Sequence, residues 1–268
     1  GRQALEMARE LGDPRTLAYA LNGRLGSTYW PENPKERLEL ADEMVGLADA
    51  AGDLEDSFEG HHWRVISLVE LGEVGRAAAE LDVMRALVEE LRQSTQGIFV
   101  TILTSSLELM RGRFGQAEEF LERVPWASTP SLPLVDAGEA VVPCQRWRLL
   151  REAARLEEAV DVIRPAAESF VWYPFLRCAH ADVLLELGDG IGARAIYEEL
   201  AADDFSAIPR DSQWMLAMSF ISPVCAAFDD VARAEILYGS QLPYADHNAF
   251  VHEGNAGSVS RALGIQTG

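Results

Sequence analysis

Five segments of the 268-residue chain share one spacing of small and large residues, and this spacing constrains the fold more than any other feature. Each segment starts with a small or turn-forming residue, has an alanine five positions later, and has a large apolar residue four positions after the alanine. The alanines recur at steps of 40, 42, 34 and 41 residues; they are Ala77, Ala117, Ala159, Ala193 and Ala234. Units of this length are typical of helical repeat arrays, in which each unit is one pair of helices.

The residue types at the shared positions fit the contact between two antiparallel helices. The first position permits a tight turn and is occupied by Gly72, Gly112, Ala154, Gly188 and Asp229. The alanine lets the second helix approach the first, and the large residue fills the groove beside it; the large residues are Leu81, Leu121, Ile163, Tyr197 and Tyr238. A weaker sixth unit centres on Ala41. The alternative is an irregular helical bundle in which the glycine and alanine spacing is coincidental.

One helix pair cannot bury its apolar stripe alone, so neighbouring pairs are expected to stack. The sequence therefore predicts an all-α fold, a right-handed superhelix (solenoid) of antiparallel helix pairs. We expect a single domain over residues 1–268, with weaker repeats in 1–53, clearer repeats in 54–239 and a partial repeat in 240–268. The abrupt helical start and the end in a helical pattern suggest a fragment of a longer protein.

The apolar periodicity and the helix breakers give the expected helix boundaries. The predicted pairs are 54–70 with 73–92, 96–110 with 113–123, 137–152 with 155–168, 175–187 with 190–202, and 212–227 with 230–239. Residues 2–50 should hold two or three helices broken by Pro31 and Pro34. Longer loops are expected near 124–136 and 203–211, and 240–256 should be mostly non-helical.

The chain is strongly acidic, with a formal net charge of −20 and a pI of about 4.6. Such a surface repels phosphate, so we expect no direct contact with nucleic acid and no binding to anionic membranes. No stretch reaches the roughly 20 apolar residues of a membrane span. Three widely separated cysteines, Cys144, Cys178 and Cys225, indicate buried thiols in a reducing cytoplasm.

No pattern of residues indicates catalysis, a metal or a cofactor, so the chain is predicted not to be an enzyme. The adjacent His61 and His62 would point about 100° apart on a helix and cannot easily hold one metal. Cys178 and His180 lack two further ligands nearby in the sequence. An unrecognised helical enzyme stays a minor alternative, which a closed pocket of perturbed ionisable groups would favour.

The shared spacing resembles the tetratricopeptide repeat. Five stretches resemble, more narrowly, the helical C-terminal region of large actinobacterial regulators that carry an AAA/STAND-type ATPase: ARELGDPRTLAYALNGR (8–24), PENPKERLELADEMVGLADAAGD (31–53), GHHWRVISLVELGEV (60–74), LMRGRFGQAEEFL (109–121), and LPYADHNAF with GSVSRALG (242–250 and 257–264). Many of these proteins also carry a LuxR-type, SARP-type or adenylate-cyclase-like output domain. The resemblance implies that this region receives a signal and controls the ATPase. The chain itself has neither a phosphate-binding loop nor a helix-turn-helix reader, so neither activity is assigned to it.

In tetratricopeptide arrays the first helix of each pair lines a concave groove. Transferring that register to this chain gives the candidate binding residues His62, Ile66, Phe99, Ile102, Cys144, Arg148, Phe175, Cys178, Asp182 and Ser219, with Ser106 and Leu216 beside them. This mixture suits a peptide, a helix or a small organic effector. The alternative is that these residues face water or pack between repeats.

Two functions follow from this pattern. The first is a sensor and protein-interaction module of a bacterial signal-transduction or transcriptional regulator. It would bind an effector or a protein partner and control its own ATPase and output domains. The second is a passive scaffold, or a module that forms a homo-oligomer without sensing a ligand.

Overall fold

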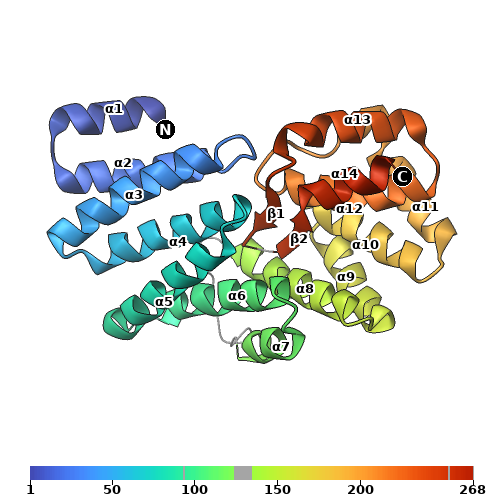
Figure 1. The fold of residues 1–268 in the computed structure, drawn as a ribbon, viewed down its shortest axis with the longest axis horizontal. Helices are drawn as coiled ribbons and strands as arrows, with labels where there is room; N and C mark the ends of the chain where they lie inside the picture. Colours follow the sequence, from blue (N-terminus) through green and yellow to red (C-terminus); the bar gives the residue numbers. More distant parts are fainter. Residues whose placement is uncertain (93, 124–134, 253, 268) are drawn as a thin grey trace. The chain divides into compact units, whose positions relative to one another are not determined.

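The computed structural model describes residues 1–92, 94–123, 135–252 and 254–267, and these residues are mostly helical. They form α1 (Arg2–Leu11), α2 (Pro14–Ser27), α3 (Pro34–Ala51), α4 (Leu54–Glu70), α5 (Val74–Leu91), α6 (Ser94–Met110), α7 (Phe114–Glu122), α8 (Val135–Glu152), α9 (Leu156–Ser169), α10 (Pro174–Glu186), α11 (Gly190–Leu200), α12 (Trp214–Ala227), α13 (Val231–Gln241) and α14 (Val259–Thr267), drawn in Figure 1. Two short 3-10 helices, η2 (Ala202–Phe205) and η3 (Leu242–Tyr244), and the strands β1 (Asn248–Val251) and β2 (Gly254–Ser258) complete the described part. The expected all-α repeat fold is confirmed.

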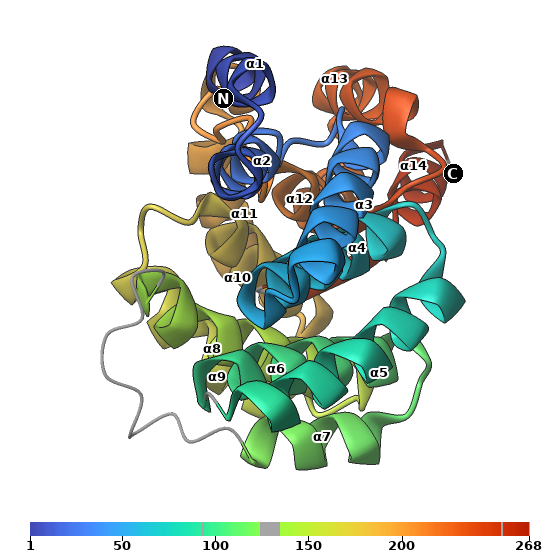
Figure 2. The ribbon, with the colours of Figure 1, turned by 90° about the vertical axis from the view of Figure 1, so that its left-hand side faces the viewer.

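The chain divides into two compact units, residues 1–103 and 104–268, with the boundary inside α6. In the first unit each helix from α1 to α5 packs against the next one along the chain, and Figure 2 shows α3 lying along α4. This unit contains a buried polar contact between α3 and α4. Arg37 on α3 is fully buried, donates to the Thr28 carbonyl at 2.9 Å and forms an ion pair with Glu70 on α4.

The second unit continues the sequence of packed helix pairs from α7 to α13 and ends in a hairpin and α14. The strands β1 and β2 form a two-stranded antiparallel sheet. The hairpin packs on α8 and α12, and α14 packs on α12 and α13. Two expectations from the sequence stay predictions: that residues 1–268 form a single domain, and that the superhelix is right-handed.

The turn between the two helices of each pair has the same backbone geometry in all five units. Its first residue has a left-handed φ at every occurrence: 79° at Gly72, 75° at Gly112, 58° at Ala154, 84° at Gly188 and 54° at Asp229. The next residue donates its N–H to the carbonyl five positions earlier, at distances of 2.8–3.5 Å. This bond satisfies a carbonyl that the end of a helix leaves without a partner. The spacing found in the sequence therefore marks one repeated helix ending.

The alanine of the repeat lies at the contact between the two helices. Four of these alanines are fully buried: Ala77, Ala117, Ala159 and Ala193. The large residues four positions after them are buried as well. In the second unit Ser105 on α6 donates to the carbonyl of Ala117 on α7 at 2.9 Å, across one such contact. The fifth alanine, Ala234 on α13, is only half-buried.

Most predicted boundaries agree with the structure to within a few residues. The N-terminal region holds three helices, and the predicted loop at 124–136 falls, except for its last two residues, outside the described residues. The β1–β2 hairpin falls in and just after the segment expected to be mostly non-helical, but no period-two alternation of apolar residues predicted it. The reason is its burial: each strand has three consecutive buried residues, so buried and exposed positions do not alternate along it.

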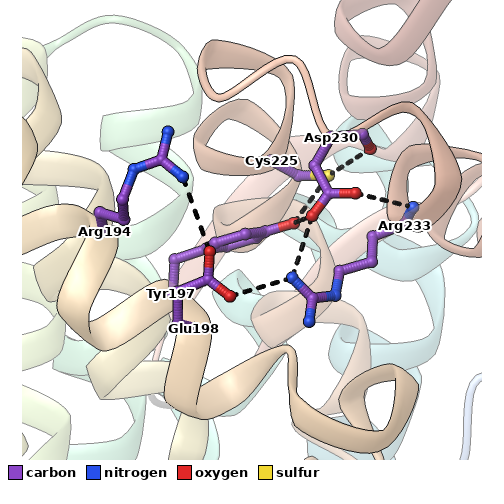
Figure 3. A network of polar contacts seen from close by, with 6 residues as sticks. All are labelled: Arg194, Tyr197, Glu198, Cys225, Asp230 and Arg233. Carbon is purple, nitrogen blue, oxygen red and sulfur yellow. Dashed lines mark hydrogen bonds and ion pairs between the residues drawn. The ribbon is translucent and has the colours of Figure 1, made fainter.

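A polar network joins α11 to the start of α13 and shows how successive repeats are held together (Figure 3). The Tyr197 hydroxyl donates to Asp230 at 2.9 Å, and Asp230 in turn accepts from the backbone N–H of Arg233 at 3.2 Å. Arg233 also lies 3.1 Å from Glu198 on α11. Burial raises the pKa of Tyr197, so its hydroxyl stays protonated and available as a donor. The network caps α13 and fixes it against α11.

We expect opposite effects from glycine and alanine at two equivalent turn positions. Gly72→Ala should lower the free energy of unfolding by about 1 kcal/mol, because a Cβ is disfavoured at a left-handed φ. Ala154→Gly relieves that cost and should raise stability by about 0.5–1 kcal/mol. Urea unfolding of both variants checks this, and equal effects of the same sign would contradict the shared turn geometry.

A second pair of variants tests the close approach of α3 and α4. A Cβ on Gly60 of α4 would lie 2.7 Å from Val45 Cγ2 and 3.2 Å from the Val45 backbone nitrogen. Gly60→Ala should therefore destabilise the chain by about 1–3 kcal/mol. Gly46 on α3 has no atom within 4 Å of its added Cβ, so Gly46→Ala should stabilise by up to about 1 kcal/mol. A stable Gly60→Ala variant would show that the helices do not meet there.

Candidate binding cavity under the C-terminal hairpin

A cavity of about 290 Å³ lies in the second unit, where the end of α6, the end of α8 and the C-terminal hairpin meet. Its lining combines two apolar residues with a set of polar groups: Leu109, Met110, Arg148, Glu152, Asn248, Asn255, Gly257 and Ser258. The volume is at the lower end of the range of small-molecule sites in proteins. The cavity therefore has the size and the mixed lining of a site for a small organic ligand.

An irregularity in the hairpin places polar residues of β2 in the cavity wall. Phe250 pairs with Asn255 and Ala249 pairs with Gly257, so Ala256 is an extra residue on β2. Gly257 has a φ of 82°, as expected at a bulge of this kind. Residues three apart on a regular strand point to opposite faces, yet Asn255 and Ser258 both line the cavity. The bulge thus brings both side chains to one site.

Arg148 is the dominant charge in the cavity wall. Its side chain is 7% exposed, and Nη2 lies 2.7 Å from Glu152 Oε1, one helical turn further along α8. Nε and Nη1 are buried without a hydrogen-bond acceptor, as is Nδ2 of Asn255. Burial lowers the pKa of Arg148 to about 10, so the guanidinium is still protonated at neutral pH. Buried donors without acceptors are costly, so these two residues of the cavity wall hold polar groups that the protein itself leaves unsatisfied.

A second arginine connects the cavity to α10. Arg151 Nη2 lies 3.0 Å from Asp182 Oδ2 and also pairs with Glu186, while Nη1 lies 3.6 Å from Glu152. Burial raises the pKa of Asp182 to about 6, with Arg151 opposing the shift. The arginines of α8 and the carboxylates of α8 and α10 therefore form one mostly buried ionic cluster beside the cavity.

The hairpin covers the side of α8 that the sequence predicted to line the groove. Gln145 Nε2 donates to the His252 carbonyl at 3.1 Å. A Cβ on Gly254 would lie 4.0 Å from the Cβ of Cys144, which is ordinary van der Waals contact. Cys144 and Arg148 are four residues apart and share one face of the helix. Both predicted groove residues therefore lie beneath the hairpin.

In the second unit the remaining predicted groove residues are buried as well. Phe175 and Cys178 have almost no exposed surface, and burial raises the pKa of the Cys178 thiol far above its usual range. Asp182 joins Arg148 in the ionic cluster through Arg151. Ser219 on α12 is buried, and its hydroxyl has no hydrogen-bond partner. For these residues, contact with a ligand stays a prediction.

In the first unit the predicted groove residues surround an aromatic contact. The His62 ring lies 5.3 Å from the Phe99 ring and 6.2 Å from the Phe58 ring, measured between centroids. Ile66 and Ile102 are buried, and Phe99 is half-buried. The neighbouring His61 lies 2.6 Å from Glu80 on α5. The two adjacent histidines thus have different partners, and the groove role of the four predicted residues stays a prediction.

The comparisons with known proteins agree with this architecture. A crystal structure of a tetratricopeptide repeat protein from Parabacteroides merdae superposes with a TM-score of 0.55 at 13% identity, covering 100% of this chain and 98% of that chain. The fold is a tetratricopeptide-like helical repeat. No family model and no curated protein sequence matches the chain. At this low identity the tetratricopeptide-like match establishes the fold and nothing about ligands.

Within the described ranges, no helix is both long and apolar enough to span a membrane. In the same part of the chain, no three His, Cys, Asp or Glu side chains come together in a group that could hold a metal ion.

Reasoning from the sequence identified Arg148 but missed its surroundings. Arg151 and Glu152 on α8 and Asn255 on β2 were not among the predicted site residues. The spacing of Arg148, Arg151 and Glu152 at i, i+3 and i+4 was visible and places all three on one side of a helix. Nothing in the sequence placed Asn255 beside them, because this contact depends on how a hairpin 107 residues from Arg148 folds back.

The ionic cluster predicts a pH dependence of stability. Because the pKa of Asp182 is raised from 3.8 to about 6, the folded chain binds this proton more tightly than the unfolded chain. The stability that this group contributes is complete below about pH 4 and is lost as the pH rises through about 6. Relative to Asp182→Asn, the free energy of unfolding should therefore fall over that interval, by on the order of 1–3 kcal/mol.

Chemical denaturation as a function of pH measures this difference, and Asp161→Asn on the exposed side of α9 controls for the change in net charge. If the free energy of unfolding, relative to Asp182→Asn, instead rises between pH 4 and 6, the attraction of Asp182 to Arg151 outweighs the cost of burying its carboxylate.

Proposed function

We propose that the chain is the sensing module of a bacterial signal-transduction or transcriptional regulator and that it binds an effector in the cavity beside Arg148. A protein or peptide partner in the predicted groove is a second mode of the same function. Binding would control an attached ATPase or output domain. The observation that carries the proposal is the pair of buried residues Arg148 and Asn255, which line a small-molecule-sized cavity and have buried N–H groups without acceptors.

Three further observations support this role. The five stretches that resemble actinobacterial ATPase regulators run from residue 8 to residue 264. The net charge of −20 disfavours contact with nucleic acid, so DNA binding would belong to another domain. The three cysteines are free and buried, which suits a reducing cytoplasm.

The position of the cavity suggests how binding would be transmitted. An isolated two-stranded hairpin is marginal, so β1 and β2 depend on their contacts with α8 and α12. A ligand that contacts Arg148 on α8 and Asn255 on β2 together would favour the docked hairpin over an undocked one. The helix α14 follows β2 directly, so docking of the hairpin also fixes the end of the described chain.

Thermal unfolding in the presence of small metabolites tests the proposal. A ligand at one hundred times its Kd should add about 2.7 kcal/mol and raise the Tm by roughly 5–10 °C. The shift should be lost in Arg148→Gln and kept in Arg146→Gln, a matched change at an exposed position two residues away. The absence of any shifting compound, or a shift that ignores Arg148, would contradict the proposal.

A passive scaffold is the second candidate, and the face of α13 favours it. Ala234 and Tyr238 are half-buried, whereas their counterparts in the four preceding repeats are buried, and Val231 beside them is 68% exposed. A partly apolar cavity of about 480 Å³ lies there. Light scattering separates the two candidates: a mass that rises with concentration, without any ligand response, supports the scaffold.

A further inference from the structure

We propose that the ligand of the Arg148 cavity is a small monocarboxylate with an apolar body. The inference rests on the proposed effector-binding function and narrows it to one chemical class. It follows from which polar groups line the cavity, which charges surround it and which apolar residues close it.

The unsatisfied polar atoms of the residues that line the cavity are donors. Nε and Nη1 of Arg148 and Nδ2 of Asn255 have almost no exposed surface of their own and lack acceptors, and the two residues as a whole are 7% and 4% exposed. They come from two elements, α8 and β2, that converge on the same space. A ligand that satisfies them must present acceptor oxygens, and a carboxylate presents two with about four lone pairs.

The surrounding charges favour an anion with a single charge. Arg148 attracts an anion, and Arg151 and Arg261 are close enough to perturb the ionisation of Arg148. Glu152 lies in the cavity wall, 2.7 Å from Arg148 Nη2, and would repel a second negative charge. With a net charge of −20 on the chain, a phosphate dianion is disfavoured relative to a carboxylate.

The rest of the cavity wall determines the other end of the ligand. Leu109 is buried and Met110 is half-buried at the end of α6, and both line the cavity. An aliphatic chain can contact them while the carboxylate lies at Arg148. The cavity volume of about 290 Å³ limits the ligand to a short body.

Calorimetric titration of the whole chain with hexanoate tests the inference, with hexanamide as the neutral isostere and inorganic phosphate as the multiply charged anion. Hexanoate should bind at least tenfold more tightly than hexanamide and phosphate, because only a monocarboxylate matches the charged donor without adding a second charge. Arg148→Gln should weaken hexanoate at least tenfold, and the exposed control Arg146→Gln should leave it unchanged.

A second variant keeps the test decisive if Arg148→Gln folds poorly. Glu152→Gln removes the carboxylate that shares Arg148 with the ligand, so hexanoate should bind several-fold more tightly. Equal binding of hexanoate and hexanamide would overturn the carboxylate inference while leaving an effector site in place. Preference for phosphate, no binding at all, or weaker binding to Glu152→Gln would also overturn it. The proposed function fails separately, when no compound of any class raises the Tm.

Discussion

The left-handed turn that ends the first helix of each pair is the constraint on which the repeat fold depends. It reverses the chain within a few residues and satisfies a carbonyl at the helix end, so the second helix starts at a fixed position relative to the first. The alanine five positions later then meets the first helix at close range. The left-handed turn recurs whether its residue is glycine, alanine or aspartate, and the alanine is fully buried in the four units whose turn residue is glycine or alanine.

The C-terminal hairpin gives the second unit a feature that stacked helix pairs alone do not have. By lying over α8 and α12 it covers the side of α8 that a regular array would leave available to a partner. Covering it leaves a cavity beside Arg148, and the bulge at Ala256 places Asn255 and Ser258 in its wall. There the predicted groove surface is covered, and the space that remains is a small cavity with a mixed polar and apolar lining.

The repeat could be predicted from the sequence because it depends on local chemistry. A turn residue, an alanine and a large apolar residue at fixed spacing define a helix pair wherever they occur, and the helix boundaries follow from the same pattern. The candidate site could be predicted from the sequence only in part. Arg148 was identified by its register, but the buried ion pairs of Arg37 and Arg151 and the position of Asn255 are tertiary contacts. The elements that make these contacts are far apart in the sequence, and the periodicity of apolar residues does not show which elements meet.

An experimental structure of the chain with bound hexanoate tests the account most directly. We expect the carboxylate oxygens within hydrogen-bond distance of the Arg148 guanidinium and the Asn255 amide, with the hairpin closed over α8. A hairpin that lies away from α8, or an Arg148 side chain that extends into solvent, would contradict the account.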